Sequence, residues 1–244
     1  MTSQQRLADV FVALAGGTSD GPLDVSGTLT VLATRSPSLL GVRAAGVVFA
    51  PGERAEVEVA GSDPKVSRME HDASEQREGP GHDCHRGRRP PVQVALDGRP
   101  TRQRWPHYAP RALELGYARV AALPLRGPAG TTGALVLLSG RQSPFSPDAL
   151  ALGQSMADFT AIALERAGEA DRSRTLNAQL ELALTSRVVI EQAKGILATR
   201  LSLTMDDAFT LLRGHARSHH RPLHDVAREI VEGRADPALL DPLP

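Results

Sequence analysis

Apolar residues recur every three or four positions along much of the chain, a spacing that predicts amphipathic helices. One such stripe predicts a helix over residues 7–14 that ends at the pair Gly16–Gly17. A second stripe runs over 25–40, and Ser36–Pro37 within it is expected to break or kink the helix, since the residue before a proline resists the α conformation. We therefore expect helices before the first strand.

The pattern then changes to short runs of β-forming residues bounded by glycine and proline, which is typical of strands. Residues 45–50 and 55–60 are joined by Pro51–Gly52 and predict a hairpin. A second pair of strands is predicted over 117–125 and 132–139. Antiparallel strands flanked by helices predict an α+β domain.

A long stretch without proline follows, from Pro147 to Arg200, and Ser146 before it is a good N-cap. Its apolar residues keep a rough helical spacing, which predicts one long helix with a weak point at Gly168. Residues 166–180 are too polar for an isolated helix, and self-association would account for them through a coiled-coil seam of Leu176, Leu180 and Leu184. A flexible linker is the alternative.

Residues 186–233 predict three short amphipathic helices, with Thr204 and Asp207 as a near capping box and Pro222 in a first turn. Their apolar faces hold Ile190, Ala193, Leu197 and Leu201 in the first helix, Met205, Ala208, Phe209 and Leu212 in the second, and Leu223, Val226, Ala227, Ile230 and Val231 in the third. One apolar face per helix predicts a three-helix core. A module this small is not expected to be a catalytic domain.

Three runs of this segment are SRVVIEQAKGILATR, DDAFTLLRGHAR and DVAREIV. They resemble the ANTAR domain, an RNA-binding module of bacterial regulators. The resemblance implies that this domain grips RNA stem-loops as a dimer and controls whether a transcript terminates or is expressed.

Two cations in this segment, Arg187 and Lys194, lie seven residues apart, so a helix places them on one side about 10 Å from each other. That spacing suits two RNA phosphates, and the amide of Gln192 can read a base edge. The candidate RNA-contacting residues are Arg187, Gln192, Lys194, Arg200 and Arg213. The alternative is a solvated helix face, because Glu191 is spaced to pair with both Arg187 and Lys194.

Charge supports nucleic-acid binding only weakly, since residues 172–234 carry ten Lys/Arg against seven Asp/Glu. Two other functions therefore stay open: a DNA-binding regulator that presents a recognition helix, and a sensor or interaction module that contacts protein. Gly195 costs a helix about 1 kcal/mol relative to alanine. We expect close packing of another helix against it, with RNA backbone as the alternative.

Several runs in the first two thirds of the chain are AAGVVFAPG, REGPGHDCHRGRRPPV, RWPHYAPRALELGYARVAALPLR, GALVLLSG and FSPDALALGQSMADFTAIAL. They resemble a GAF domain over residues 25–166. The resemblance implies a sensory or dimerising role and names no ligand. In such relatives a cysteine commonly follows the Gly-Pro pair, whereas this chain has Gly81 there and its cysteine at Cys84. This departure argues against thiol-based sensing.

Two motifs invite catalytic or metal chemistry, and neither has its required context. The run His82–His85 lacks a second spaced ligand pair, so we expect a helical turn with Cys84 buried in it. Residues 17–21 fit G-x-S-x-G, but a helix rather than a strand is predicted before them. We expect no enzyme activity, no cofactor and no metal site.

Composition sets the outer limits for the 244-residue chain. Its net charge is zero, it has one cysteine, and it lacks an apolar run near 18 residues, which favours a soluble cytoplasmic protein that does not bind membranes. The expected partners are structured RNA, a second copy of the chain and an unidentified small molecule. The expected architecture is an N-terminal helix and loop (1–24), a GAF-like domain with an antiparallel sheet flanked by helices (25–166), a helical connector (167–185), an ANTAR-like three-helix bundle (186–233) and a tail (234–244).

Overall fold

The computed structural model describes residues 3–16, 24–52, 56–87 and 93–240. The chain divides into two compact units, 1–171 and 172–244, and each is considered by itself. The division falls inside the predicted connector. The G-x-S-x-G run at 17–21 lies outside the described residues.

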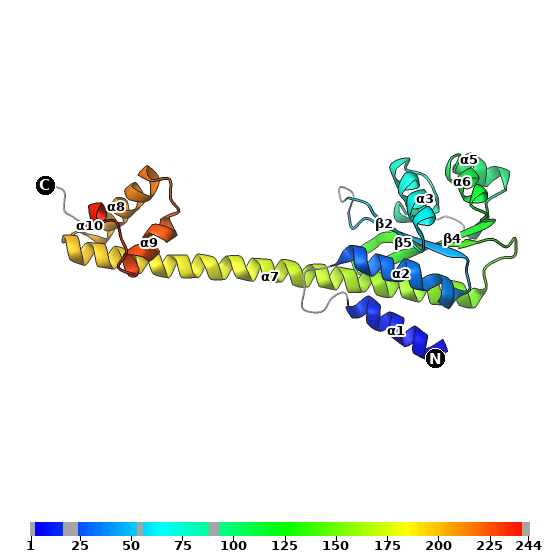
Figure 1. The fold of residues 1–244 in the computed structure, drawn as a ribbon, viewed down its shortest axis with the longest axis horizontal. Coiled ribbons are helices and arrows are strands. Elements are labelled where there is room, and N and C mark those ends of the chain that lie inside the picture. Colours follow the sequence, from blue (N-terminus) through cyan, green and yellow to red (C-terminus); the bar gives the residue numbers. More distant parts are fainter. Residues whose placement is uncertain (1–2, 17–23, 53–55, 88–92, 241–244) are drawn as a thin grey trace. The chain divides into compact units, whose positions relative to one another are not determined.

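The first unit is built on a five-stranded antiparallel sheet in the order β2-β1-β5-β4-β3 (Figure 1). The strands are β1 (Ala44–Phe49), β2 (Glu58–Gly61), β3 (Gln93–Ala95), β4 (Arg119–Gly127) and β5 (Gly130–Ser139). In the register of the central strands, Val47 of β1 lies between Ala60 and Leu135. Both predicted hairpins are confirmed. The edge strand β3 escaped prediction because three residues are too few to show an alternating pattern.

Helices cover both faces of this sheet (Figure 1). Helices α1 (Ser3–Gly16), α2 (Val25–Leu40) and the first part of α7 (Pro147–Leu201) pack on one face, and α3 (Pro64–Glu75), α4 (Pro80–His85), α5 (Arg99–Arg104) and α6 (Tyr108–Glu114) lie on the other. Successive residues of β5 alternate between the faces, with Leu135 and Leu137 in one core and Val136 and Leu138 in the other. The predicted α+β class is confirmed.

The expected break at Ser36–Pro37 is absent, because α2 runs through Pro37 to Leu40. A proline ring removes a single backbone donor. The helix ends one turn later at Gly41, whose left-handed backbone (φ 64°) lets its N–H donate to the Pro37 carbonyl. Burial of the α2 leucines against the sheet outweighs the loss of one hydrogen bond.

The second unit contains the last part of α7 with α8 (Met205–Ser218), α9 (Leu223–Val231) and the short α10 (Pro237–Leu240). The buried core of this bundle is Ala193, Leu197, Ala208, Leu212, Ala216, Val226, Ala227, Ile230 and Leu239. The predicted three-helix core is thus confirmed. Thr204 caps α8 by accepting a hydrogen bond from the Asp207 N–H at 3.2 Å. Met205, predicted to be apolar core, is 44% exposed because it is the first residue of its helix.

Helix α7 is continuous over 55 residues and includes Gly168, which confirms the predicted long helix. Its N-terminus is capped by Ser146, whose Oγ accepts from the Ala149 N–H at 3.2 Å. The seam residues Leu176, Leu180 and Leu184 are each more than half exposed. Among the described residues, no helix is both long enough and apolar enough to cross a membrane.

Candidate nucleic-acid interface

Four of the five predicted RNA-contacting side chains are exposed on the bundle. Arg187, Gln192 and Arg200 lie on the last part of α7, and Arg213 lies on α8. None of the three arginines forms an ion pair with a described residue. Their guanidinium groups are therefore available to anions in solution.

The fifth residue, Lys194, sits differently. Its side chain is only 15% exposed, and its Nζ donates to both carboxylate oxygens of Glu191 at 3.0 Å. The same ammonium lies 5.5 Å from the ring centroid of Phe209 on α8, a cation–π distance. Lys194 therefore joins α7 to α8 in this structure, and an RNA phosphate would have to compete with Glu191 for it.

The α7 candidates do not share one face. At about 100° per residue, Lys194 lies within about 20° of Arg187, whereas Gln192 and Arg200 are each about 140° from Arg187, on opposite sides of the axis. Ala193 and Leu197 fill the arc between Lys194 and Arg200 that faces the core. The two arginines consequently border the solvent-facing surface of α7 rather than forming one ridge.

Gly195 lies on this solvent-facing surface, and the expectation that a neighbouring helix packs closely against it is wrong. A Cβ placed at Gly195 would meet nothing within 4 Å among the described residues. Its closest neighbours on the same helix surface are Val188, which is exposed, and Gln192. The glycine thus leaves a stretch of α7 backbone open to something outside the described chain.

Two further exposed cations went unnoticed in the sequence. Arg217 lies one turn after Arg213 on α8, and Arg228 is exposed on α9. The i, i+4 spacing of Arg213 and Arg217 was the signal that could have revealed the first. By contrast, Arg221 is held by Glu229 through two hydrogen bonds of 2.8 and 2.6 Å, which lower the pKa of Glu229.

The run His82–His85 of the first unit forms α4, as expected. Asp83 accepts hydrogen bonds from Arg104 Nε at 2.7 Å and Trp105 Nε1 at 3.0 Å, so its carboxylate ties α4 to the segment around α5. Cys84 is buried against Ala122 and Ala134, and burial raises the pKa of its thiol to about 11. This cysteine is a small core residue and not a reactive thiolate.

The departure at Gly81 has a steric reason. A Cβ at this position would lie 2.9 Å from Val48 Cγ2 and 3.2 Å from Val136 Cγ2, because α4 presses directly onto the sheet there. The site therefore has no room for a cysteine side chain.

A profile of the GAF domain matches residues 23–165. The chain belongs to the GAF-domain family. A profile of the ANTAR domain matches residues 178–231, so the chain joins a GAF domain to an ANTAR domain, and both are regulatory rather than catalytic families. The ANTAR match contains Arg187, Gln192, Lys194, Arg200 and Arg213.

Solved structures show similarity to the GAF part only at low identity. A GAF domain of a phosphoenolpyruvate-protein phosphotransferase from Acinetobacter is 11% identical, with 68% of this chain and 97% of that chain covered and a TM-score of 0.46. The GAF-B domain of DevS from Mycobacterium smegmatis is 23% identical, with 62% and 99% covered and a TM-score of 0.42. Scores this low add nothing to the family match. No curated protein matches the chain.

A buried acid lies inside the GAF domain and was not foreseen. Glu70 on α3 is 1% exposed and accepts a hydrogen bond from the Tyr108 hydroxyl at 2.7 Å. Gly46 on β1 makes room for it, since a Cβ there would lie 2.7 Å from Glu70 Cγ. Burial raises the pKa of Glu70 to about 7, although the hydrogen bond from Tyr108 acts in the opposite direction.

The GAF domain also has a polar pocket of about 530 Å³ at one end of its sheet. Arg77, His82, His85 and Arg86 are among its lining residues. The Nδ1 atom of His85 is buried and has no hydrogen-bond partner among the described residues. This donor set suits a small polar or anionic molecule.

Proposed function

We propose that this protein is an RNA-binding regulator of gene expression, in which a GAF domain controls an ANTAR domain that binds RNA stem-loops. The observation that carries the proposal is the ANTAR match over residues 178–231. The regulation we propose is transcription antitermination or a related control after initiation. The GAF match supports a sensory domain as the source of the signal.

The surface of the bundle supports binding to a polyanion. Arg187, Arg200 and Arg213 are exposed and have no carboxylate partner among the described residues, and Arg217 lies beside Arg213. Guanidinium groups bind phosphates through paired hydrogen bonds. The excess of cations is small, so the shape of the RNA and its loop bases must supply much of the affinity.

The open backbone at Gly195 also supports an external partner. Glycine in a helix interior costs about 1 kcal/mol, and no described side chain approaches to justify it. Gln192 lies one turn earlier, where its amide can reach a base edge. We propose that the surface around Gly195 is approached by RNA, with Arg187 and Arg200 holding phosphates at its borders.

Dimerisation is part of the proposal because an isolated helix does not expose a leucine stripe without cause. Leu176, Leu180 and Leu184 recur every four residues on α7 and are solvent-exposed. Pairing with the same stripe of a second copy would bury them. The expected partner of this stripe is therefore another copy of this chain.

Signal transfer has a physical route in α7 itself. Met156 and Leu164 of this helix belong to the core of the GAF unit, and Ala193 and Leu197 belong to the core of the bundle. We propose that a small polar molecule in the GAF pocket biases this shared helix and thereby RNA binding.

The test is binding of the full chain to a labelled RNA stem-loop in competition with duplex DNA. The proposal expects stem-loop RNA to compete far better than duplex DNA, and affinity to fall as salt rises. Arg187→Ala should weaken binding, whereas Arg35→Ala, which removes an equally exposed arginine from α2 of the GAF domain, should not. Preference for duplex DNA would favour the DNA-binding alternative, and absence of binding to either would favour a protein-interaction module.

A further inference from the structure

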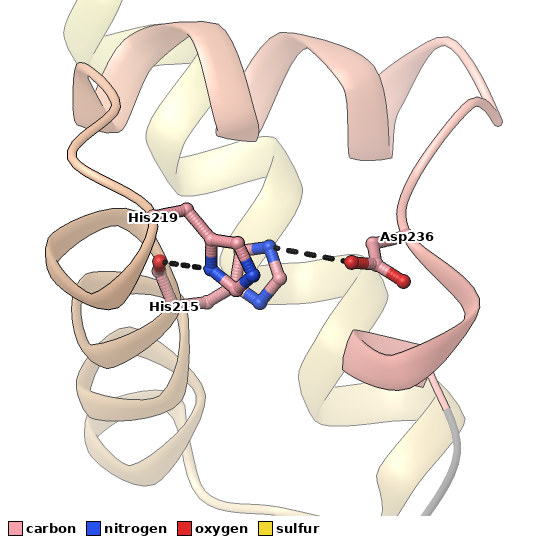
Figure 2. A group of neighbouring side chains, drawn as sticks. All are labelled: His215, His219 and Asp236. Carbon is pink, nitrogen blue, oxygen red and sulfur yellow. Dashed lines mark hydrogen bonds and ion pairs between the residues drawn. The ribbon is translucent and has the colours of Figure 1, made fainter.

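Two histidines and an aspartate converge in the C-terminal bundle (Figure 2). His215 and His219 stand one turn apart on α8, and Asp236 comes from the segment between α9 and α10. One ligand atom from each residue lies within 4.8 Å of the other two. Seventeen residues separate His219 from Asp236 in the sequence, so the fold brings them together.

We propose that His215, His219 and Asp236 form a binding site for a divalent transition-metal ion, with Zn²⁺ as the ion that this ligand set fits. Histidines spaced i, i+4 on a helix present both rings to one ion, and imidazole with carboxylate is a zinc ligand set. A tetrahedral site with bonds of about 2.0–2.1 Å separates its ligand atoms by about 3.3 Å. Rotation of exposed side chains is enough to close the observed spacing to that value.

The hydrogen bonds of His219 prepare one ligand atom. Its Nδ1 lies 2.9 Å from the His215 backbone carbonyl oxygen. A carbonyl only accepts, so Nδ1 carries the proton and donates it. The Nε2 atom of His219 then keeps the lone pair that a metal needs, and the backbone contact fixes the ring orientation, as in known metal sites.

An ordinary ion pair explains the arrangement of His215 and Asp236 poorly. The distance from His215 Nε2 to Asp236 Oδ2 is 3.9 Å, which is too long for a hydrogen bond. Burial and the neighbouring His219 lower the pKa of His215, while Asp236 and Glu229 raise it and Arg221 lowers it. The His215 ring, stacked on His219 with centroids 4.1 Å apart, is thus held near its neutral, ligand-competent form.

Metal binding would tie the segment after α9 to the end of α8. An ion bound only by the folded state stabilises that state by mass action. Three protein ligands also leave a fourth position for water. The site would therefore couple the availability of a metal ion to the stability of the helical bundle.

The test is a Zn²⁺ titration of the full chain, produced without a histidine tag and measured by competition with a zinc-binding dye. The wild-type chain should bind one Zn²⁺ at this site. His215→Ala and His219→Ala should each lower the affinity by more than about tenfold, because removing a ligand costs more than removing the groups that orient it. His220→Asn and His224→Gln remove histidines of the same unit that lie outside the cluster, and should bind Zn²⁺ like the wild type.

A fold control keeps the result interpretable. Asp236→Asn changes a partly exposed side chain outside the helices, so it should keep the metal-free melting temperature while losing most of the rise that Zn²⁺ produces in the wild type. Equal Zn²⁺ affinity in wild type, His215→Ala, His219→Ala and Asp236→Asn would overturn the proposal. Loss of binding in Cys84→Ala instead would also overturn it, because it would place the metal in the GAF domain.

Discussion

The two units of this protein treat their charged residues in opposite ways. The GAF unit buries Glu70 and Asp83 inside and satisfies both with hydrogen bonds from neighbouring elements. The helical bundle has one apolar core without a fully buried charge among the described residues, and it keeps its arginines at the surface. The comparison indicates an interior adapted to respond to chemical conditions in one unit and an exterior adapted to meet a polyanion in the other.

The largest expected effect tests whether the two cores are energetically separate. Leu212→Ala removes a fully buried side chain of the bundle and should destabilise it by about 2–5 kcal/mol. Leu137→Ala should do the same to the GAF unit. In a thermal melt followed by circular dichroism, each variant should lower the transition of its own unit and leave the other in place. A common shift of both transitions would show that the units unfold together.

The next effect concerns pH and Glu70. A carboxyl whose pKa is raised to about 7 in the folded state holds its proton there while the unfolded chain has lost it. Stability from this group is therefore present below pH 4.5 and is lost as the pH rises through about 7. Glu70→Gln keeps an acceptor for Tyr108 and removes the charge, so it should be more stable than the wild type by up to about 3 kcal/mol above pH 7 and nearly equal to it below pH 4.5.

A matched control for this prediction lies on the same helix. Asp72→Asn removes an exposed carboxylate from α3 and should leave the pH dependence of unfolding unchanged. Denaturant titrations at pH 4 and pH 8 compare the three proteins. The assignment of the pH effect to Glu70 fails if Glu70→Gln and the wild type lose stability in parallel between these values.

The smallest effect links stability to binding at Gly195. Gly195→Ala should stabilise the bundle by about 0.5–1 kcal/mol, since alanine is the better helix former and a Cβ meets nothing there. The same change should weaken RNA binding if the backbone is approached closely. Gly214→Ala, at an equally open position on α8, should give a similar gain in stability with a smaller loss of affinity. Unchanged RNA binding by Gly195→Ala would remove this surface from the proposed interface.

Patterns of apolar residues were enough to predict both hairpins and the three-helix core, because their periods extend over many residues. They were not enough where burial depends on the tertiary fold. Glu70 reads as an exposed helix residue until Gly46 and Tyr108 are seen to surround it. Lys194 reads as a free cation until Phe209 and Glu191 are seen to hold it.

The metal-ligand cluster shows the same limit. The i, i+4 spacing of His215 and His219 is visible in the sequence, but Asp236 is brought to them only by the return of the chain after α9. Short elements such as β3 were missed because a three-residue pattern has no period to detect.

The central claim, that RNA is bound by the bundle and not by the GAF domain, is tested most directly by ultraviolet crosslinking of the full chain to a stem-loop RNA, followed by mass spectrometry of the linked peptides. The account predicts crosslinks within residues 178–231, concentrated near Arg187, Gln192 and Gly195. Crosslinks confined to residues 23–165 would contradict it.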